Sequence, residues 1–426
     1  MCLGILMGLL AGVLPLRAQA PPARRPTQTR EVETLLQTAE AALKQSDFAT
    51  AAKALKLVVE IQPESAPAWF NLAYAYSGLH QDEQAVQAYQ KALELQPDLF
   101  EARLNLGILL LEMQRAESAL ESLQKAVALK PQHSRARLYF GRALSVVGQP
   151  AAAEKQFQEA LRLDPGLAIA QFDLGQLYLG QKRYAEAGAS FQKALELAPK
   201  LASAQLGMAL ASERLGQLAE AVPHFEQYLA AKPDDFETRF HLARVYLQLG
   251  KNEQALEKLQ TLYQAKPDLP GLAAALGDVY ALHKKFPEAE KFYQQALAAK
   301  PGEADLHRAL AQTLLEEEKF SEAEAEYRAA LALDPRNRAA AQGLASSLYF
   351  QKRYQEAIPL IEALVRSPNP PAGLFFVLAT CYDHLHDRPK ALETYERYLE
   401  LSHNQNPDRE WQARQRVKLL RRVLGK

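Results

Sequence analysis

Cysteine is scarce in this chain, since Cys2 and Cys381 are the only two in 426 residues. A net charge is also lacking, because 50 lysines and arginines balance 50 aspartates and glutamates. A nucleic-acid-binding protein needs a basic face, so this balance argues against that class. Glycine-rich phosphate loops, His-Glu-x-x-His, paired Cys-x-x-Cys and nucleophile elbows are absent as well. We therefore predict a protein that is not an enzyme and that uses no cofactor or metal.

Proline, in contrast, recurs with a fixed period of 34 residues, which is typical of a repeat array. With the proline as position 32, eleven units begin at residues 32, 66, 100, 134, 168, 202, 236, 270, 304, 338 and 372. Position 20 is alanine in every unit, and position 8 is always alanine or glycine. Small residues at fixed places predict that two helices approach closely there. The nine periodic prolines are Pro63, Pro97, Pro131, Pro165, Pro199, Pro233, Pro267, Pro301 and Pro335.

Each unit carries the spacing of two amphipathic helices. Positions 7, 11, 24 and 28 are mostly large and apolar, and a spacing of four puts each pair on one helix face. The turn between the helices often holds glycine, as at Gly148, Gly216 and Gly250, where a left-handed backbone costs little. The proline closes the second helix because its ring cannot continue one. Each unit therefore predicts a helix A, a turn, a helix B and a second turn.

The full pattern resembles the tetratricopeptide repeat family. The second unit matches best, with Trp69, Leu72-Ala73, Tyr76, Ala85, Tyr89, Ala92 and Pro97 at the family's positions. The resemblance covers residues 32–405 and implies an all-α fold, a right-handed superhelical α-solenoid of about eleven 34-residue helix-turn-helix repeats. Asn369 replaces the periodic proline in the tenth unit, where we expect the regularity to weaken.

Both ends of the chain depart from the repeat. Residues 3–14 are apolar and Ala18-Gln19-Ala20 follows, which predicts a signal peptide over residues 1–20 and export to the periplasm or the exterior. The run is shorter than the about 20 residues that span a bilayer, although a retained anchor is the alternative. Residues 21–31 read as a proline-rich disordered lead-in. Residues 406–426 predict a basic amphipathic helix that caps the array, in preference to one that docks on a partner or a membrane.

The resemblance also implies where a ligand binds. In this family the A helices line a concave groove, with positions 2, 5, 9 and 12 facing it. Position 5 is apolar in the first seven units, which predicts an interaction surface if these side chains are exposed. The alternative is that position 5 packs against the next A helix. The candidate groove residues are Leu36, Phe70, Tyr74, Leu104, Ile108, Leu138, Arg142, Phe172, Leu206, Phe240 and Arg244.

These observations favour a non-enzymatic scaffold that binds a protein or peptide partner in its groove. We expect apolar contacts there, with Arg142 and Arg244 selecting for an acid in the ligand. Neither an asparagine ladder at position 6 nor a lysine clamp for a carboxylate is complete in this chain. The alternative is an assembly or docking factor of a cell-envelope complex that acts through its convex face or its basic C-terminal helix.

Overall fold

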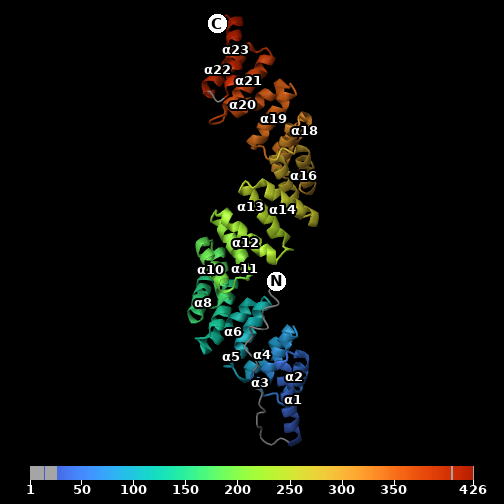
Figure 1. Cartoon of the computed structure of the whole chain (residues 1–426), viewed down its shortest axis with the longest axis vertical. Helices are drawn as coiled ribbons and strands as arrows, with labels where there is room; N and C mark the ends of the chain where they lie inside the picture. Colours follow the sequence, from blue (N-terminus) through green and yellow to red (C-terminus); the bar gives the residue numbers. More distant parts are fainter. Residues whose placement is uncertain (1–13, 15–25, 404–405, 426) are drawn as a thin grey trace. The chain divides into compact units, whose positions relative to one another are not determined.

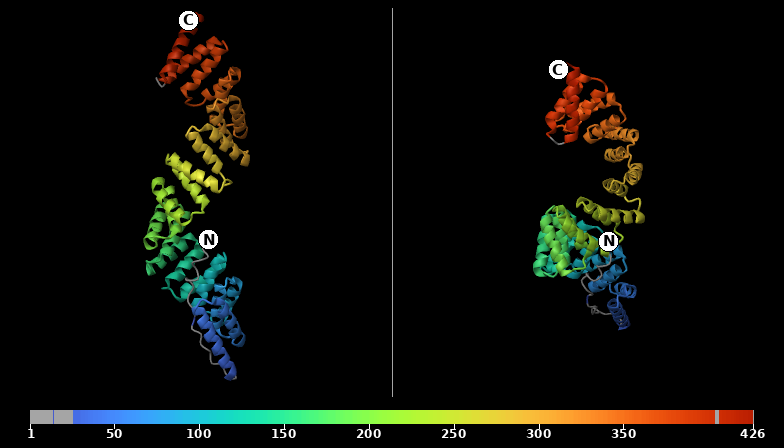
Figure 2. Two further views of the ribbon diagram at one scale, coloured as in Figure 1. Left: turned by 45° about the vertical axis from the view of Figure 1, so that its right-hand side comes forward. Right: turned by 45° about the horizontal axis from the view of Figure 1, so that its top comes forward.

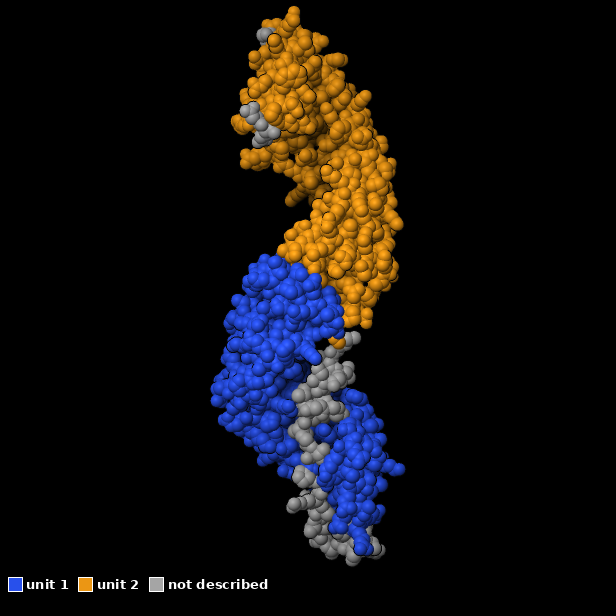
Figure 3. All heavy atoms as spheres, in the orientation of Figure 1, with its two compact units in different colours: residues 1–231 blue, residues 232–426 orange. Residues whose placement is uncertain are grey.

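The computed structural model describes Leu14 and residues 26–403 and 406–425. Within these residues the chain forms twenty-three α-helices and no strand. Figures 1 and 2 draw the helices coloured along the sequence. The expected all-α fold of repeated helix pairs is therefore confirmed. The chain divides into two compact units, residues 1–231 and 232–426, which Figure 3 colours separately.

Unit 1 contains the first twelve helices of the described residues. They are α1 (Pro26–Lys44), α2 (Phe48–Ile61), α3 (Ala66–Gly78), α4 (Asp82–Leu95), α5 (Phe100–Glu112), α6 (Ala116–Leu129), α7 (Ser134–Val146), α8 (Pro150–Leu163), α9 (Ala168–Gly180), α10 (Tyr184–Leu197), α11 (Ala202–Arg214) and α12 (Leu218–Ala231).

Unit 2 contains the remaining eleven. They are α13 (Phe236–Gln248), α14 (Asn252–Ala265), α15 (Leu272–Leu282), α16 (Phe286–Ala299), α17 (Ala304–Glu316), α18 (Phe320–Leu333), α19 (Arg338–Phe350), α20 (Tyr354–Val365), α21 (Ala372–His384), α22 (Arg388–Ser402) and α23 (Pro407–Val423).

The helix boundaries follow the 34-residue period closely. Nine of the eleven expected unit starts coincide with the first residue of an A helix. The two exceptions are helix α15, which starts two residues late, and helix α1, which starts six residues early. Helix α15 starts at Leu272, after Pro270 and a left-handed Gly271 with φ 82°. Helix α1 starts at Pro26, so the expectation of a disordered lead-in is wrong for residues 26–31, while residues 21–25 lie outside the described residues.

The periodic proline acts through the residue before it. Helix α4 ends at Leu95, and Gln96, which precedes Pro97, has φ −138° and ψ 89°. A residue before proline is driven away from helical angles, so helix B ends at this point. In the tenth unit, where Asn369 stands in place of the proline, helix α20 has 12 residues instead of the usual 14. The repeat is therefore less regular at Asn369, as expected, and the irregularity is a B helix that is two residues shorter.

The turn between helices A and B has one backbone geometry throughout. Position 15 has a positive φ in all eleven units, from Ser46 in the first to His386 in the last. Glycine occupies it only at Gly148, Gly216 and Gly250. The other units place an ordinary side chain in a left-handed conformation, which costs about 1–2 kcal/mol per residue.

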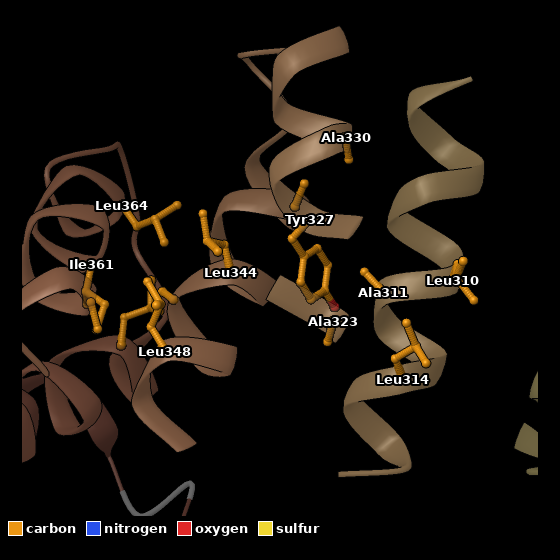
Figure 4. Close-up of a cluster of buried hydrophobic side chains, with 14 of the residues drawn as sticks. Leu310, Ala311, Leu314, Ala323, Tyr327, Ala330, Leu344, Leu348, Ile361 and Leu364 are labelled. Carbon is orange, nitrogen blue, oxygen red and sulfur yellow. The ribbon is translucent and has the colours of Figure 1, made fainter. Parts of the chain in front are cut away.

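The core of each repeat is a contact between position 8 of helix A and position 24 of helix B. A Cβ added to Gly175 would lie 2.7 Å from the ring of Phe191, which is fully buried. Figure 4 shows the equivalent side chain in unit 2, Tyr327 of α18, lying between Ala311 of α17 and Leu344 of α19. The small residues at position 8 therefore make room for a large position-24 side chain, as the sequence predicts.

Helix α23 closes unit 2 by packing on α22. The side chain of Asn406 accepts a hydrogen bond from the Arg409 amide at 3.1 Å, which caps the helix. Ala413, Val417 and Leu420 are buried, as the predicted apolar stripe requires. Trp411 is 64% exposed and does not belong to that stripe.

Candidate functional site: the A-helix groove of unit 1

Four of the seven candidate position-5 side chains are part of the core. Leu36, Phe70, Leu104 and Leu138 are at most 5% exposed. The expectation that these four offer an exposed surface to a ligand is therefore wrong, and one reason is a contact with helix B. Position 5 packs on position 24 of its own repeat: the ring centroids of Phe70 and Tyr89 are 5.7 Å apart, and those of Phe172 and Phe191 are 5.9 Å apart.

The remaining predicted residues are spread over both units. Phe172 and Leu206 of unit 1, together with Phe240 of unit 2, are half-buried. At position 9, Tyr74 is half-buried and Ile108 is fully buried. Arg244 is exposed on α13 of unit 2 and so lies outside the groove of unit 1.

Unit 1 has a cavity of about 360 Å³ in this groove, between the A helices α5, α7 and α9. Its lining includes two predicted residues, Ile108 and Arg142. Val146 stands at the cavity with 69% of its surface exposed. The other lining residues are Leu111, Glu112, Tyr139, Ser145, Phe157, Asp173, Gln176 and Leu177.

An internal ion pair neutralises the arginine of this cavity. The Nε of Arg142 lies 2.5 Å from Oδ2 of Asp173, on the neighbouring A helix. Burial raises the pKa of the Asp173 carboxyl, and the Arg142 guanidinium opposes that rise. Because Arg142 already pairs with the carboxylate of Asp173, the structure gives no support to the expectation that Arg142 selects for an acid in the ligand.

The hydroxyl of Tyr139 is a buried polar group in the cavity wall that lacks a partner among the described residues. The side chain is 2% exposed, and its hydroxyl has no hydrogen-bond partner among the described residues. Burial raises the pKa of this hydroxyl, so it keeps its proton and remains a donor. A buried polar group without a partner costs about 1–3 kcal/mol. The cavity can therefore offer one unused hydrogen bond beside an apolar wall.

Glu112 is the other acid at the cavity edge. Burial, followed by the charge of Asp82, raises the pKa of its carboxyl. Together with the neutralised Arg142 pair, this carboxylate makes the cavity a poor place for a second negative charge. An apolar group that carries a hydrogen-bond acceptor suits these walls better.

Position 6 of the repeats carries a sequence signal for this site that the position-5 pattern obscures. Tyr139 and Asp173 both stand at position 6, where they interrupt an asparagine ladder. Position 6 of α3, α5, α7 and α9 holds Asn71, Asn105, Tyr139 and Asp173, four polar residues in succession. Polar residues on the buried side of an A helix point to hydrogen bonding there.

Unit 2 has a separate cavity of about 870 Å³ beside its last helix. Aromatic side chains from α19, α21, α22 and α23 line it, namely Tyr349, Phe376, Tyr395 and Trp411. Arg416 donates two hydrogen bonds to the carboxylate of Asp383, from Nε and Nη2, each at 2.6 Å. Arg421 pairs with Glu396 at 2.7 Å. Part of the basic face of α23 is thus used within the chain.

Among the residues that the structure describes, no three His, Cys, Asp or Glu side chains are placed to hold a metal ion. The ring of His384 stacks on Tyr354, with centroids 4.6 Å apart. Cys381 is buried, and burial raises the pKa of its thiol to about 12. In the described part of the chain, each helix falls short of the length and apolarity needed to cross a bilayer.

Stacked helix pairs with a groove on their A helices define a repeat-built scaffold protein. Sequence models of the tetratricopeptide repeat match residues 33–65, 66–99, 88–121, 138–202, 213–268, 250–313, 308–373 and 343–406. The chain therefore belongs to the tetratricopeptide repeat family. This fold is typically non-enzymatic and binds protein or peptide partners, so the chain is a protein-interaction scaffold.

Solved structures with the same kind of fold are similar at low identity. MamA (residues 41 to end) from Desulfovibrio magneticus RS-1 is 23% identical, with 40% of this chain and 97% of that chain covered and a TM-score of 0.39. PilF from Pseudomonas aeruginosa is 22% identical over 51% and 99%, with a TM-score of 0.45. Yeast Tom70 is 16% identical over 93% and 97%, with a TM-score of 0.34. A comparison with curated proteins gave no significant match.

Proposed function

We propose that this scaffold binds a segment of a partner protein in the A-helix groove of unit 1, at the cavity between α5, α7 and α9. The observation that supports this most directly is the unpaired Tyr139 hydroxyl in the wall of a cavity that also has apolar lining residues. A ligand would bury an apolar side chain against Leu111 and Val146 and accept a hydrogen bond from Tyr139. Arg142 and Asp173 would hold the wall in place as a neutral pair.

A substitution at Val146 tests this proposal without disturbing the core, because the side chain is 69% exposed. Val146→Asp places a charge where an apolar group should bind, and burying one such side chain is worth about 1.5–3 kcal/mol. We expect the affinity for the partner segment to fall by about tenfold or more, measured by titration calorimetry. Leu282→Asp is the matched control, since Leu282 is 63% exposed and lies in α15 of unit 2.

Two results would count against the groove. Equal affinity of the Val146→Asp chain and the unchanged chain would show that the cavity is not the site. Equal losses from both aspartate substitutions would show a general effect of charge. Affinity capture with the whole chain, followed by mass spectrometry, supplies the partner from which the segment is taken.

A second docking surface is favoured by the exposed apolar edge of α23. Trp411, Leu419 and Val423 are each at least 48% exposed and line the cavity of unit 2. A docking factor of a larger assembly would use this edge, and its contacts would be apolar, since Arg416 and Arg421 already face acids of unit 2. Trp411→Ser should then abolish assembly while Arg422→Ser leaves it intact. Binding of the native chain to anionic vesicles, lost in Arg422→Ser, would indicate a membrane surface instead.

Export is a further part of the proposal. It is supported by the apolar run 3–14 and the small-residue site ending at Ala20. N-terminal sequencing of the protein from its native cells should find Pro21 first. A chain that keeps residues 1–20 and stays with the membrane would point to the retained anchor.

A further inference from the structure

Unit 2 has a further cavity, of about 570 Å³, between the ends of the B helices α18 and α20 and the start of α19. Leu331, Leu360 and Leu364 give it apolar walls. Arg336 and Arg338 line it as well, from the loop after α18 and the first residue of α19. The cavity thus joins an apolar interior to two cationic side chains.

These two arginines carry charge that the chain does not neutralise. Both are exposed, and among the described residues neither guanidinium pairs with a carboxylate. The hydrogen bond that Nη2 of Arg338 donates to the carbonyl of Leu364 is long, at 3.4 Å. Asp334 is the acid nearest to both in sequence, and its Oδ1 accepts a hydrogen bond from the main-chain amide of Arg336 at 3.0 Å.

Other arginines near this end of unit 2 are paired within the chain. Nη1 of Arg353 lies 2.5 Å from the carboxylate of Glu324, and Nη2 of Arg366 lies 3.4 Å from that of Glu362. Glu362 also accepts a hydrogen bond from the hydroxyl of Tyr382 at 2.5 Å. These acids are already in use, so a carboxylate for the two arginines of the cavity has to come from another molecule.

The arginine pair is particular to this repeat junction. Arg338 stands at position 1, which is uncharged in the other ten units, and Arg336 stands at position 33, which is an acid in four units. The helix that borders the cavity, α20, is also the shortened B helix of 12 residues. The other repeats stack without such a pair, so stacking does not require it, and this favours a role in binding a ligand.

We propose that this cavity binds a segment of a partner protein in which an acidic residue stands next to a large apolar one. The apolar side chain fills the cavity against Leu331 and Leu360, and the carboxylate accepts hydrogen bonds from Arg336 and Arg338. A guanidinium presents paired N–H groups in the geometry that a carboxylate accepts. Two arginines are too few for an anionic membrane surface, which is bound by clusters of about four to eight basic residues.

Selection from a displayed library of random seven-residue peptides, with the whole chain as target, tests the site. We expect a class of selected peptides in which Asp or Glu stands beside Leu, Ile or Phe. These peptides should bind the Arg336→Gln/Arg338→Gln chain at least about tenfold more weakly, because glutamine keeps N–H donors and removes the charge. Arg366→Gln is the matched control, since this exposed arginine already pairs with Glu362, and it should leave the affinity unchanged.

A second variant covers the case in which the double substitution harms the fold. Ala363→Asp places a carboxylate at the cavity, on an exposed position of α20, where it competes for the two guanidiniums. It should lower peptide affinity to a similar extent. The carbonyl of Leu364 also accepts a hydrogen bond from Ser367 Oγ at 2.6 Å, so loss of the Arg338 contact does not leave it unpaired.

The outcomes separate the possible occupants. Selected peptides that bind the unchanged and the double-glutamine chains equally, or that still bind when their acid is replaced by its amide, would overturn the proposal. Binding to phosphatidylglycerol vesicles that depends on the two arginines, without acidic peptides in the selection, would indicate a membrane instead. Self-association that the double substitution abolishes in sedimentation would indicate a second copy of the chain. Val146 lies in unit 1, so the result is independent of the test there.

Discussion

Gly207→Ala should destabilise unit 1, although alanine is the better helix former. Gly207 lies at position 6 of α11, and a Cβ built on it would come within 2.5 Å of two ring atoms of Phe191. Ordinary contacts are 3.4–4 Å, so the ring would have to move by about an ångström. Movement toward α9 is limited by the close backbone of Gly175, where a built Cβ would also lie 2.7 Å from the Cε1 atom of the ring.

The size of the effect follows from two opposing terms. Overpacking a core costs about 1–3 kcal/mol. Replacing glycine by alanine inside a helix gains about 1 kcal/mol. We therefore expect a net loss of up to about 2 kcal/mol for Gly207→Ala. Gly188→Ala is the matched control, since Met208 Sδ at 3.9 Å is the nearest atom to its added Cβ. Only the helix term applies there, so Gly188→Ala should stabilise by about 0.5–1 kcal/mol.

Urea unfolding followed by circular dichroism measures the difference. Repeat arrays do not always unfold in one step, so the midpoint of the transition that includes unit 1 is the quantity to compare. The two substitutions should shift it in opposite directions. In a double-mutant cycle, Phe191→Leu should relieve most of the loss caused by Gly207→Ala. A Gly207→Ala midpoint at or above that of Gly188→Ala would show that the ring is not wedged between α9 and α11.

Four further predictions concern single groups. Tyr139→Phe should leave the stability of the fold unchanged or raise it by about 1 kcal/mol, because no hydrogen bond within the described residues is lost. The same substitution should weaken partner binding several-fold. A stability loss above about 1 kcal/mol in thermal unfolding would contradict this prediction. Cys381, whose pKa burial raises to about 12, should resist Ellman's reagent at pH 8 until the chain is unfolded. Burial raises the pKa of Tyr395 to about 12 as well. The stability that the neutral forms of Cys381 and Tyr395 contribute is therefore fully present below about pH 9 and is lost progressively toward about pH 12. The decrease in Tm at alkaline pH should be smaller in Cys381→Ala. Lys182→Gly, at a φ of 62°, should raise the urea midpoint by an amount worth about 1 kcal/mol, and a lower midpoint would show that the turn is not strained.

The sequence predicted the repeat well because the relevant signals are local. A proline acts on the residue before it, and spacings of four lie on one helix, so most A helices begin where the period places them. The small residue at position 8 could also be interpreted from the sequence, because a fixed small residue indicates a close helix contact.

The burial of position 5 could not be predicted in the same way. Phe70 is apolar whether it faces a ligand or the core, and its burial depends on the ring of Tyr89 from the next helix. The pairing of Arg142 with Asp173 joins residues 31 positions apart, on different A helices. Both contacts are tertiary, so neither can be read from the sequence pattern. The expected groove was an exposed apolar surface that selects for an acid, whereas the structure has a nearly neutral cavity there.

If a partner binds in this groove as proposed, position 6 would carry more of the specificity of unit 1 than position 5. In the repeats of Phe70 and Phe172, position 5 packs on position 24, and a side chain used for packing does less to distinguish one ligand from another. Position 6 changes its chemistry from repeat to repeat: Asn71 binds a main chain, Tyr139 presents a hydroxyl, and Asp173 neutralises Arg142. A segment lying across these A helices would meet hydrogen-bonding groups before it met a net charge. The proposed groove site would then favour an extended, apolar segment with free main-chain groups.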